Sequence, residues 1–191
     1  MKRIFSLVFV AIVATVTVFG QTAGGGKAPS ARFPGASESD FVKLRTAKLS
    51  TPLPLPTWVP VGFKIEKITM KLGTKIPIQD RVLVIVYSRK LSSGKMQRFA
   101  FEAGFDGLGG LPYDLTKVVS SAVGKIDLMY QPLDIDDSGK KLLDFAMTEW
   151  FKVGRTDFHY DGMYGHEEGD TSMAMISMSD TEKILRSLQR F

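Results

Sequence analysis

The chain has 191 residues, of which 44% are hydrophobic and 24% charged, which is typical of one globular domain with its own core. It contains no cysteine, which excludes disulfide bonds, thiolate metal sites, a cysteine nucleophile and an N-terminus lipidated on cysteine. The net charge of +5 is uneven, because residues 41–100 hold 12 Lys and Arg against 2 acidic residues, whereas residues 101–180 hold 6 against 15. Such asymmetry indicates either a face that binds a polyanion or basic strands that pair with acidic strands.

The first 20 residues predict an export signal. Lys2 and Arg3 precede an uncharged apolar run over residues 4–19, shorter than the roughly 20 residues that a membrane-spanning helix needs. We therefore expect cleavage before Gln21 and no transmembrane helix in the mature chain; retention of the run as an anchor helix is the alternative. Export predicts a periplasmic or extracellular location associated with the cell envelope, and it disfavours nucleic acid as a partner.

Residues 21–50 have the composition of a flexible linker, because Gly, Ala and Pro dominate residues 21–35 without a periodic pattern. One short helix is expected near the end of this segment, over residues 37–49. Ser37 can cap its first turn together with Asp40, and the apolar residues that follow would share one face of the helix.

An extended arm follows the linker. Its prolines fix their own φ angles and hold the preceding residues out of the helical region. They are Pro52, Pro54, Pro56 and Pro60. Trp58 can bury a large area at low entropic cost, so we expect it to be buried and to dock the arm onto a sheet.

A first strand is expected over residues 63–72. Its apolar residues change phase between Ile65 and Ile68, and a strand changes phase only by inserting a residue. The pattern therefore predicts a β-bulge near Glu66 and Lys67.

Further apolar patterns, bounded by Gly, Ser and Pro, predict a series of short strands. They cover residues 81–89, 96–102, 116–122, 125–131, 143–151, 156–160 and 172–178. Ser179, with Glu182 three residues later, predicts a capping box for a terminal helix over residues 181–190. Short strands joined by tight turns predict a single α+β domain over residues 51–191, with a mostly antiparallel twisted sheet and a C-terminal helix.

Basic residues gather on the first three predicted strands and form a candidate binding face for an anionic partner. The face consists of Lys64, Lys67, Lys71, Arg89 and Arg98. The alternative is that acidic side chains from Asp127, residues 134–137 and Asp144 fold over these strands and neutralise them.

The two histidines and several acidic residues crowd one segment, residues 157–170. Imidazole and carboxylate groups are ligands for divalent transition metals, and His159, Asp161, His166 and Glu167 are the candidate ligands. Their spacing matches no helical ligand pair, and an exposed polar hairpin tip is the alternative interpretation.

Short motifs resemble a family of exported β-rich domains of unknown function, the DUF4367 type, and more distantly the C-terminal half of the RseB/MucB periplasmic regulators. The similar segments are residues 56–63 (PTWVPVGF), residues 110–113 (GLPY), the strand that carries Trp150, and residues 184–188 (ILRSL). The resemblance covers residues 52–188 and implies a β-rich fold without catalytic residues. The chain departs from the family by Val61, where an acidic residue is common, and by a longer loop over residues 161–170.

The sequence contains no nucleophile elbow and no phosphate-binding glycine motif. We therefore expect an exported, non-enzymatic envelope module without a cofactor, with a binding or regulatory role. Its expected partner is a protein or an anionic envelope component, which is compatible with a peripheral membrane contact. The alternative is a metal-binding exported protein that uses residues 157–170.

Overall fold

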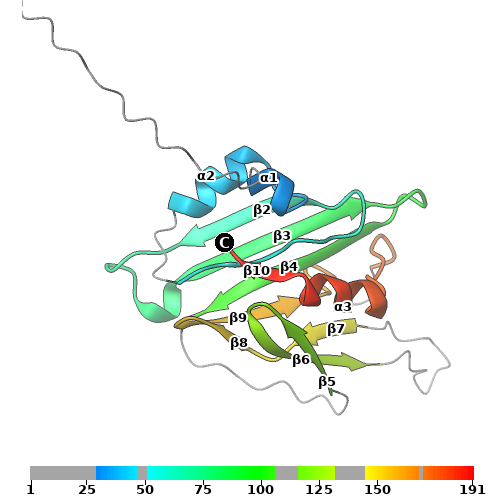
Figure 1. Ribbon diagram of the computed structural model, residues 1–191. Helices are drawn as coiled ribbons and strands as arrows, with labels where there is room; N and C mark the ends of the chain where they lie inside the picture. The colour runs from blue at the N-terminus through cyan, green and yellow to red at the C-terminus, as the bar shows by residue number, and fades with distance from the viewer. Residues whose placement is uncertain (1–28, 47–50, 106–115, 132–144, 168–169) are drawn as a thin grey trace, which may run out of the picture.

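The computed structural model describes residues 29–46, 51–105, 116–131, 145–167 and 170–191 (Figure 1). The predicted export signal lies outside these residues, as do residues 134–137 and Asp144. No helix within the described ranges has the length and apolarity needed to cross a membrane.

An antiparallel sheet of eight strands forms the main layer, in the order β2-β3-β4-β9-β7-β6-β5, with β8 also paired to β9 (Figure 1). The strands are β2 (Lys64–Lys71), β3 (Val82–Lys90), β4 (Met96–Gly104), β5 (Thr116–Ser121), β6 (Gly124–Gln131), β7 (Phe145–Thr148), β8 (Phe151–Val153) and β9 (Thr156–Asp161). A short 3₁₀ helix, η1 (Ile78–Asp80), lies in the turn between β2 and β3.

The second layer covers one face of this sheet, which we call the inner face. It consists of α1 (Pro29–Arg32), α2 (Glu38–Thr46), α3 (Met178–Arg186) and a two-stranded ribbon, in which β1 (Pro54–Pro56) pairs with β10 (Leu188–Arg190). In Figure 1, β10 and α3 cross in front of the sheet, and α1 and α2 lie beside β2. The opposite, outer face carries most of the charged residues discussed below. This sheet with a C-terminal helix fits the predicted α+β class.

Aromatic side chains fill the core between the two layers. Tyr87 and Phe99 are directly opposite on β3 and β4, and their rings stack at 4.7 Å between centroids. Tyr160 on β9 continues the cluster, 5.5 Å from Phe99. Phe33 and Phe41, from residues assigned to the linker on sequence, are also buried in this core. The folded body therefore includes the described residues upstream of residue 51.

Several local predictions are confirmed. The register between β2 and β3 shifts between Ile65 and Lys67, which is the predicted bulge. Helix α2 begins after Ser37, whose hydroxyl accepts a hydrogen bond from the backbone amide of Asp40 at 3.2 Å. In each case the signal lies within a few neighbouring residues, so the local sequence was sufficient.

The prediction that Trp58 is a buried anchor is wrong, because 36% of its surface is exposed. The arm is held instead by Leu53 and Leu55, which are 3% and 0% exposed, and by the pairing of β1 with β10.

The C-terminal predictions need three corrections. Helix α3 is capped by Ser177, not Ser179, and the Ser177 hydroxyl accepts from the Asp180 amide at 3.1 Å. The helix ends at Arg186, because the chain then turns into β10. In place of the strand predicted over residues 172–178, Met173 forms an isolated bridge with Met96, and Met178 already begins α3.

One strand was predicted over residues 143–151. In the part that the structure describes, this segment instead contains β7, which ends at Thr148, and the start of β8. Both strands pair with β9, so the chain bends after Thr148 but stays in the sheet.

Candidate functional site

Three of the predicted basic residues, Lys64, Lys67 and Lys71, lie on β2, which is an edge strand of the large sheet. All three side chains are exposed. Lys64 and Lys67 share the outer face although they are three residues apart, because the bulge between them reverses the strand phase. They do not form one compact patch, since Lys64 and Lys71 are separated by about 23 Å at about 3.3 Å per residue.

Arg98 joins Lys64 on the outer face, because both residues are opposite Ser88 of β3. Its guanidinium group donates two hydrogen bonds to the carboxylate of Glu66, at 2.9 and 3.1 Å. These bonds hold the pKa of Glu66 below its usual value, against a weaker opposing effect of burial. The charge of Arg98 is therefore largely compensated within the sheet.

Arg89 lies on the inner side of β3 and ties the arm to the sheet. Its Nε donates to Gln97 Oε1 at 2.7 Å, and its Nη1 donates to the carbonyl oxygen of Val61 at 3.1 Å. The guanidinium carbon lies 4.8 Å from the centroid of the Phe63 ring. Arg89 thus has a structural role in addition to its charge.

Two groups of cations result, one at each end of β2 and β3. We call the first group the basic end, where β2 begins and β3 ends, at the right of Figure 1. It consists of Lys64, Arg89, Lys90, Lys95 and Arg98. The second group, the far end, lies around the turn that carries η1 and consists of Lys71, Lys75 and Arg81.

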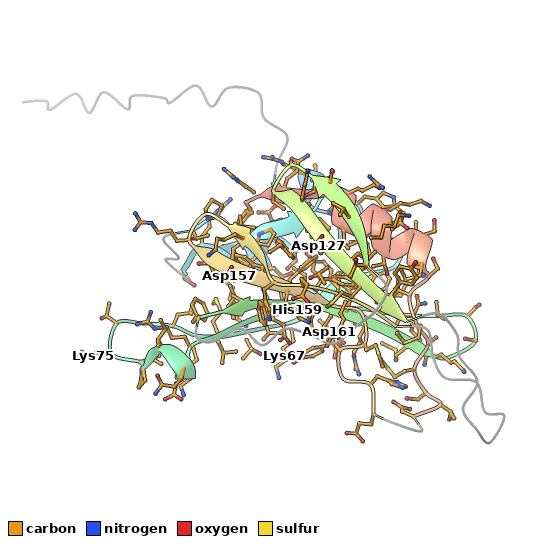
Figure 2. The ribbon with its side chains drawn as sticks, turned by 90° about the horizontal axis from the view of Figure 1, so that it is seen from below. Lys67, Lys75, Asp127, Asp157, His159 and Asp161 are labelled. Atoms are coloured by element: carbon orange, nitrogen blue, oxygen red, sulfur yellow. The ribbon has the colours of Figure 1, made fainter. Side chains whose placement is uncertain are left out.

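Acidic residues of the second half of the chain do not cover the β2 lysines in the described structure. Asp127 lies on β6, five strands from β2, which is about 24 Å at about 4.8 Å per strand. Figure 2 shows it on the opposite side of the molecule from Lys67. The loop after β9 comes closer to the basic end, because the carbonyl oxygen of Ser172 accepts a hydrogen bond from the Met96 amide at 2.8 Å. Hydrogen bonds from Ser172 hold the pKa of Asp170 in this loop below its usual value, and the charge of Arg98 adds a smaller lowering effect.

A partly buried group of titratable residues occupies the outer face of β4 and β9, formed by Glu102, His159 and Asp161. Glu102 is directly opposite His159. Asp161 follows His159 two residues later on the same face of β9, and Figure 2 labels both residues. Burial raises the pKa of Glu102, and the neighbouring Asp161 raises it further. Burial also raises the pKa of Asp161, although its carboxylate accepts a hydrogen bond from the Met163 amide at 2.7 Å.

His159 is 7% exposed and belongs to the packed structure of the sheet. Its Nδ1 lies 2.6 Å from the carbonyl oxygen of Thr148, and its ring lies 5.0 Å from that of Trp150. Burial lowers the pKa of the imidazole, so the neutral ring is favoured. Sequence reasoning found His159 and Asp161 but missed Glu102, because the register that brings β4 beside β9 is not visible in the local pattern.

The four proposed metal ligands are not brought together. His159 and Asp161 lie on β9, whereas His166 and Glu167 lie in the following loop, where the Glu167 side chain is exposed. Among the described residues, no group of three or more His, Asp or Glu side chains is arranged to bind a metal ion.

Comparisons with protein-family models, with curated proteins and with solved structures find no match to this chain. The resemblance to the DUF4367 type and to RseB/MucB regulators therefore stays a prediction.

Proposed function

We propose that the chain is an exported, non-enzymatic binding module of the cell envelope that engages an anionic component through the basic end. One observation carries the proposal, which is the placement of the exposed residues Lys64, Lys90 and Lys95 together at one end of the sheet. No ion pair within the described part of the chain involves these three lysines.

The geometry of adjacent strands explains why these lysines act together. Lys64 is opposite Ser88, and Lys90 lies two residues beyond Ser88 on the same face, so the two lysines are diagonal neighbours about 7–8 Å apart at Cα. Like charges at this separation repel each other and are unfavourable in the isolated protein. An anionic surface offsets this repulsion, because each Lys or Arg near it contributes about 1 kcal/mol to the binding free energy. The attraction acts within a Debye length, which is about 8 Å at physiological salt.

Charge reversal at the two ends of the sheet tests the proposal. Lys64→Glu/Lys90→Glu should weaken binding of the mature protein to phosphatidylglycerol vesicles and to soluble polyglutamate by at least about 30-fold, because two lysine contacts are removed and two repulsive carboxylates are added. Lys71→Glu/Lys75→Glu, the matched control at the far end, should bind almost as tightly as the wild type. Binding measured by cosedimentation and by fluorescence anisotropy should also weaken as salt rises.

Two results would contradict the proposal. One is absence of binding to both probes at low salt; the other is an equal loss of binding in the two double variants, which would indicate a general effect of net charge.

A further inference from the structure

The loop that connects the arm to β2 presents two exposed apolar side chains. Trp58 is 36% exposed and Val61 is 95% exposed. We call residues 57–62 the arm tip. Contiguous exposed apolar surface is a feature of interaction sites, whereas single exposed apolar side chains are common on any surface.

Hydrogen bonds hold the arm tip in place against the end of α3. The amide and the hydroxyl of Thr57 both donate to the carbonyl oxygen of Ser187, at 3.1 and 2.8 Å. The amide of Trp58 donates to the Ser187 hydroxyl at 3.1 Å. Pro56 and Pro60 fix two further φ angles. The indole is therefore presented on a restrained backbone, so its insertion into a partner would cost little conformational entropy.

Cations flank both exposed side chains. The Nζ atom of Lys183 on α3 lies 5.5 Å from the centroid of the Trp58 ring, and it also forms a long ion pair with Asp180 at 3.8 Å. Arg89 donates to the carbonyl oxygen of Val61, and Lys90 follows it at the end of β3. The arm tip thus places an indole beside Lys183 and the backbone of Val61 beside Arg89.

We propose that the arm tip inserts Trp58 and Val61 into the headgroup region of an anionic lipid membrane, while the basic end contacts the headgroup phosphates. The proposal rests on the proposed function and names its anionic component as a lipid surface. Tryptophan favours the membrane–water interface, because its ring is apolar and its N–H can remain hydrogen-bonded. Basic residues beside it add the electrostatic attraction that a single apolar loop lacks.

The two tryptophans of the chain allow a direct test, since each can be isolated by replacing the other with phenylalanine. In Trp150→Phe, the emission of Trp58 should shift to shorter wavelength on addition of phosphatidylglycerol vesicles, and brominated lipid should quench it. In Trp58→Phe, the emission of Trp150, which packs against His159, should stay unchanged.

Binding of apolar variants provides the second readout. Trp58→Ala/Val61→Ser should bind the vesicles about tenfold more weakly, as expected for the loss of roughly one buried large apolar side chain. Ile78→Ser is the matched control, because Ile78 is 48% exposed at the far end of the sheet and should not matter.

The outcomes separate this inference from the proposed function. Lysine-dependent vesicle binding without a change in Trp58 emission would overturn insertion and leave the proposed function intact. Binding to polyglutamate without binding to the vesicles would likewise overturn insertion and leave the proposed function intact. Loss of an envelope protein partner in Trp58→Ala/Val61→Ser, with unchanged Trp58 emission on vesicles, would identify the arm tip as a protein site and also overturn the inference.

Discussion

At the scale of single residues, the surroundings of a side chain decide its role more than its type does. The two glutamates Glu66, on β2, and Glu102, on β4, both lie on the outer face of the sheet. Glu66 accepts two hydrogen bonds from Arg98, which lower its pKa, whereas burial beside Asp161 raises the pKa of Glu102. The ionised form is therefore favoured by folding at Glu66 and disfavoured at Glu102.

This difference predicts opposite effects of two matched substitutions on the free energy of unfolding. A raised folded-state pKa means that the stability contributed by protonated Glu102 is complete below the unfolded-state pKa and is lost as the pH rises through the folded-state pKa. Gln mimics the protonated carboxyl, so Glu102→Gln should be more stable than the wild type at pH 7, and the gain should vanish towards pH 4. Asp161 and His159, which also face Glu102, are retained in both proteins.

Glu66→Gln should instead lower the free energy of unfolding at pH 7, by at most about 1 kcal/mol for a pair this exposed. Urea unfolding of the three proteins at several pH values measures both effects. A loss of stability in Glu102→Gln at pH 7 would show that the ionised carboxylate has a favourable partner in the folded protein.

At the scale of elements, the local sequence predicted those features whose cause lies within a few residues. The bulge of β2 follows from the phase change around Glu66, and the start of α2 follows from Ser37. The pairing of β1 with β10 was not predictable in the same way, because its partners, such as Leu55 and Gln189, are far apart in the chain and each strand has only three residues. Trp58 was misjudged for a related reason, because the ribbon pairing buries Leu55 and leaves the indole beside α3.

The start of α3 provides the test at this scale. The sequence predicted Ser179 as the cap, but it is the Ser177 hydroxyl that accepts the hydrogen bond from the Asp180 amide. Ser177→Ala should therefore lower the free energy of unfolding by about 1 kcal/mol, whereas Ser179→Ala should change it by less than about 0.5 kcal/mol. Thermal or urea unfolding measures the difference, and the reverse order of the two effects would place the cap at Ser179.

At the scale of the whole molecule, the basic residues of the sequence do not form one compact face. Most cations of β2, β3 and β4 and their turns gather at a basic end and a far end, about 23 Å apart along β2, and Lys67 lies between the two ends. Acidic groups are not spread evenly against them, since Glu66 compensates Arg98, whereas Lys64, Lys90 and Lys95 remain exposed. The metal-binding alternative loses support, because the four predicted ligands form no group arranged to bind a metal ion among the described residues.

The central claim is that the basic end, with the arm tip beside it, is the surface that contacts an anionic partner. Lysine footprinting by acetylation and mass spectrometry, with and without phosphatidylglycerol vesicles at low salt, tests it directly. We predict that the vesicles slow modification of Lys64, Lys90 and Lys95 several-fold and leave Lys71 and Lys75 unchanged. Equal protection of all five lysines, or protection of Lys71 and Lys75 alone, would contradict the account.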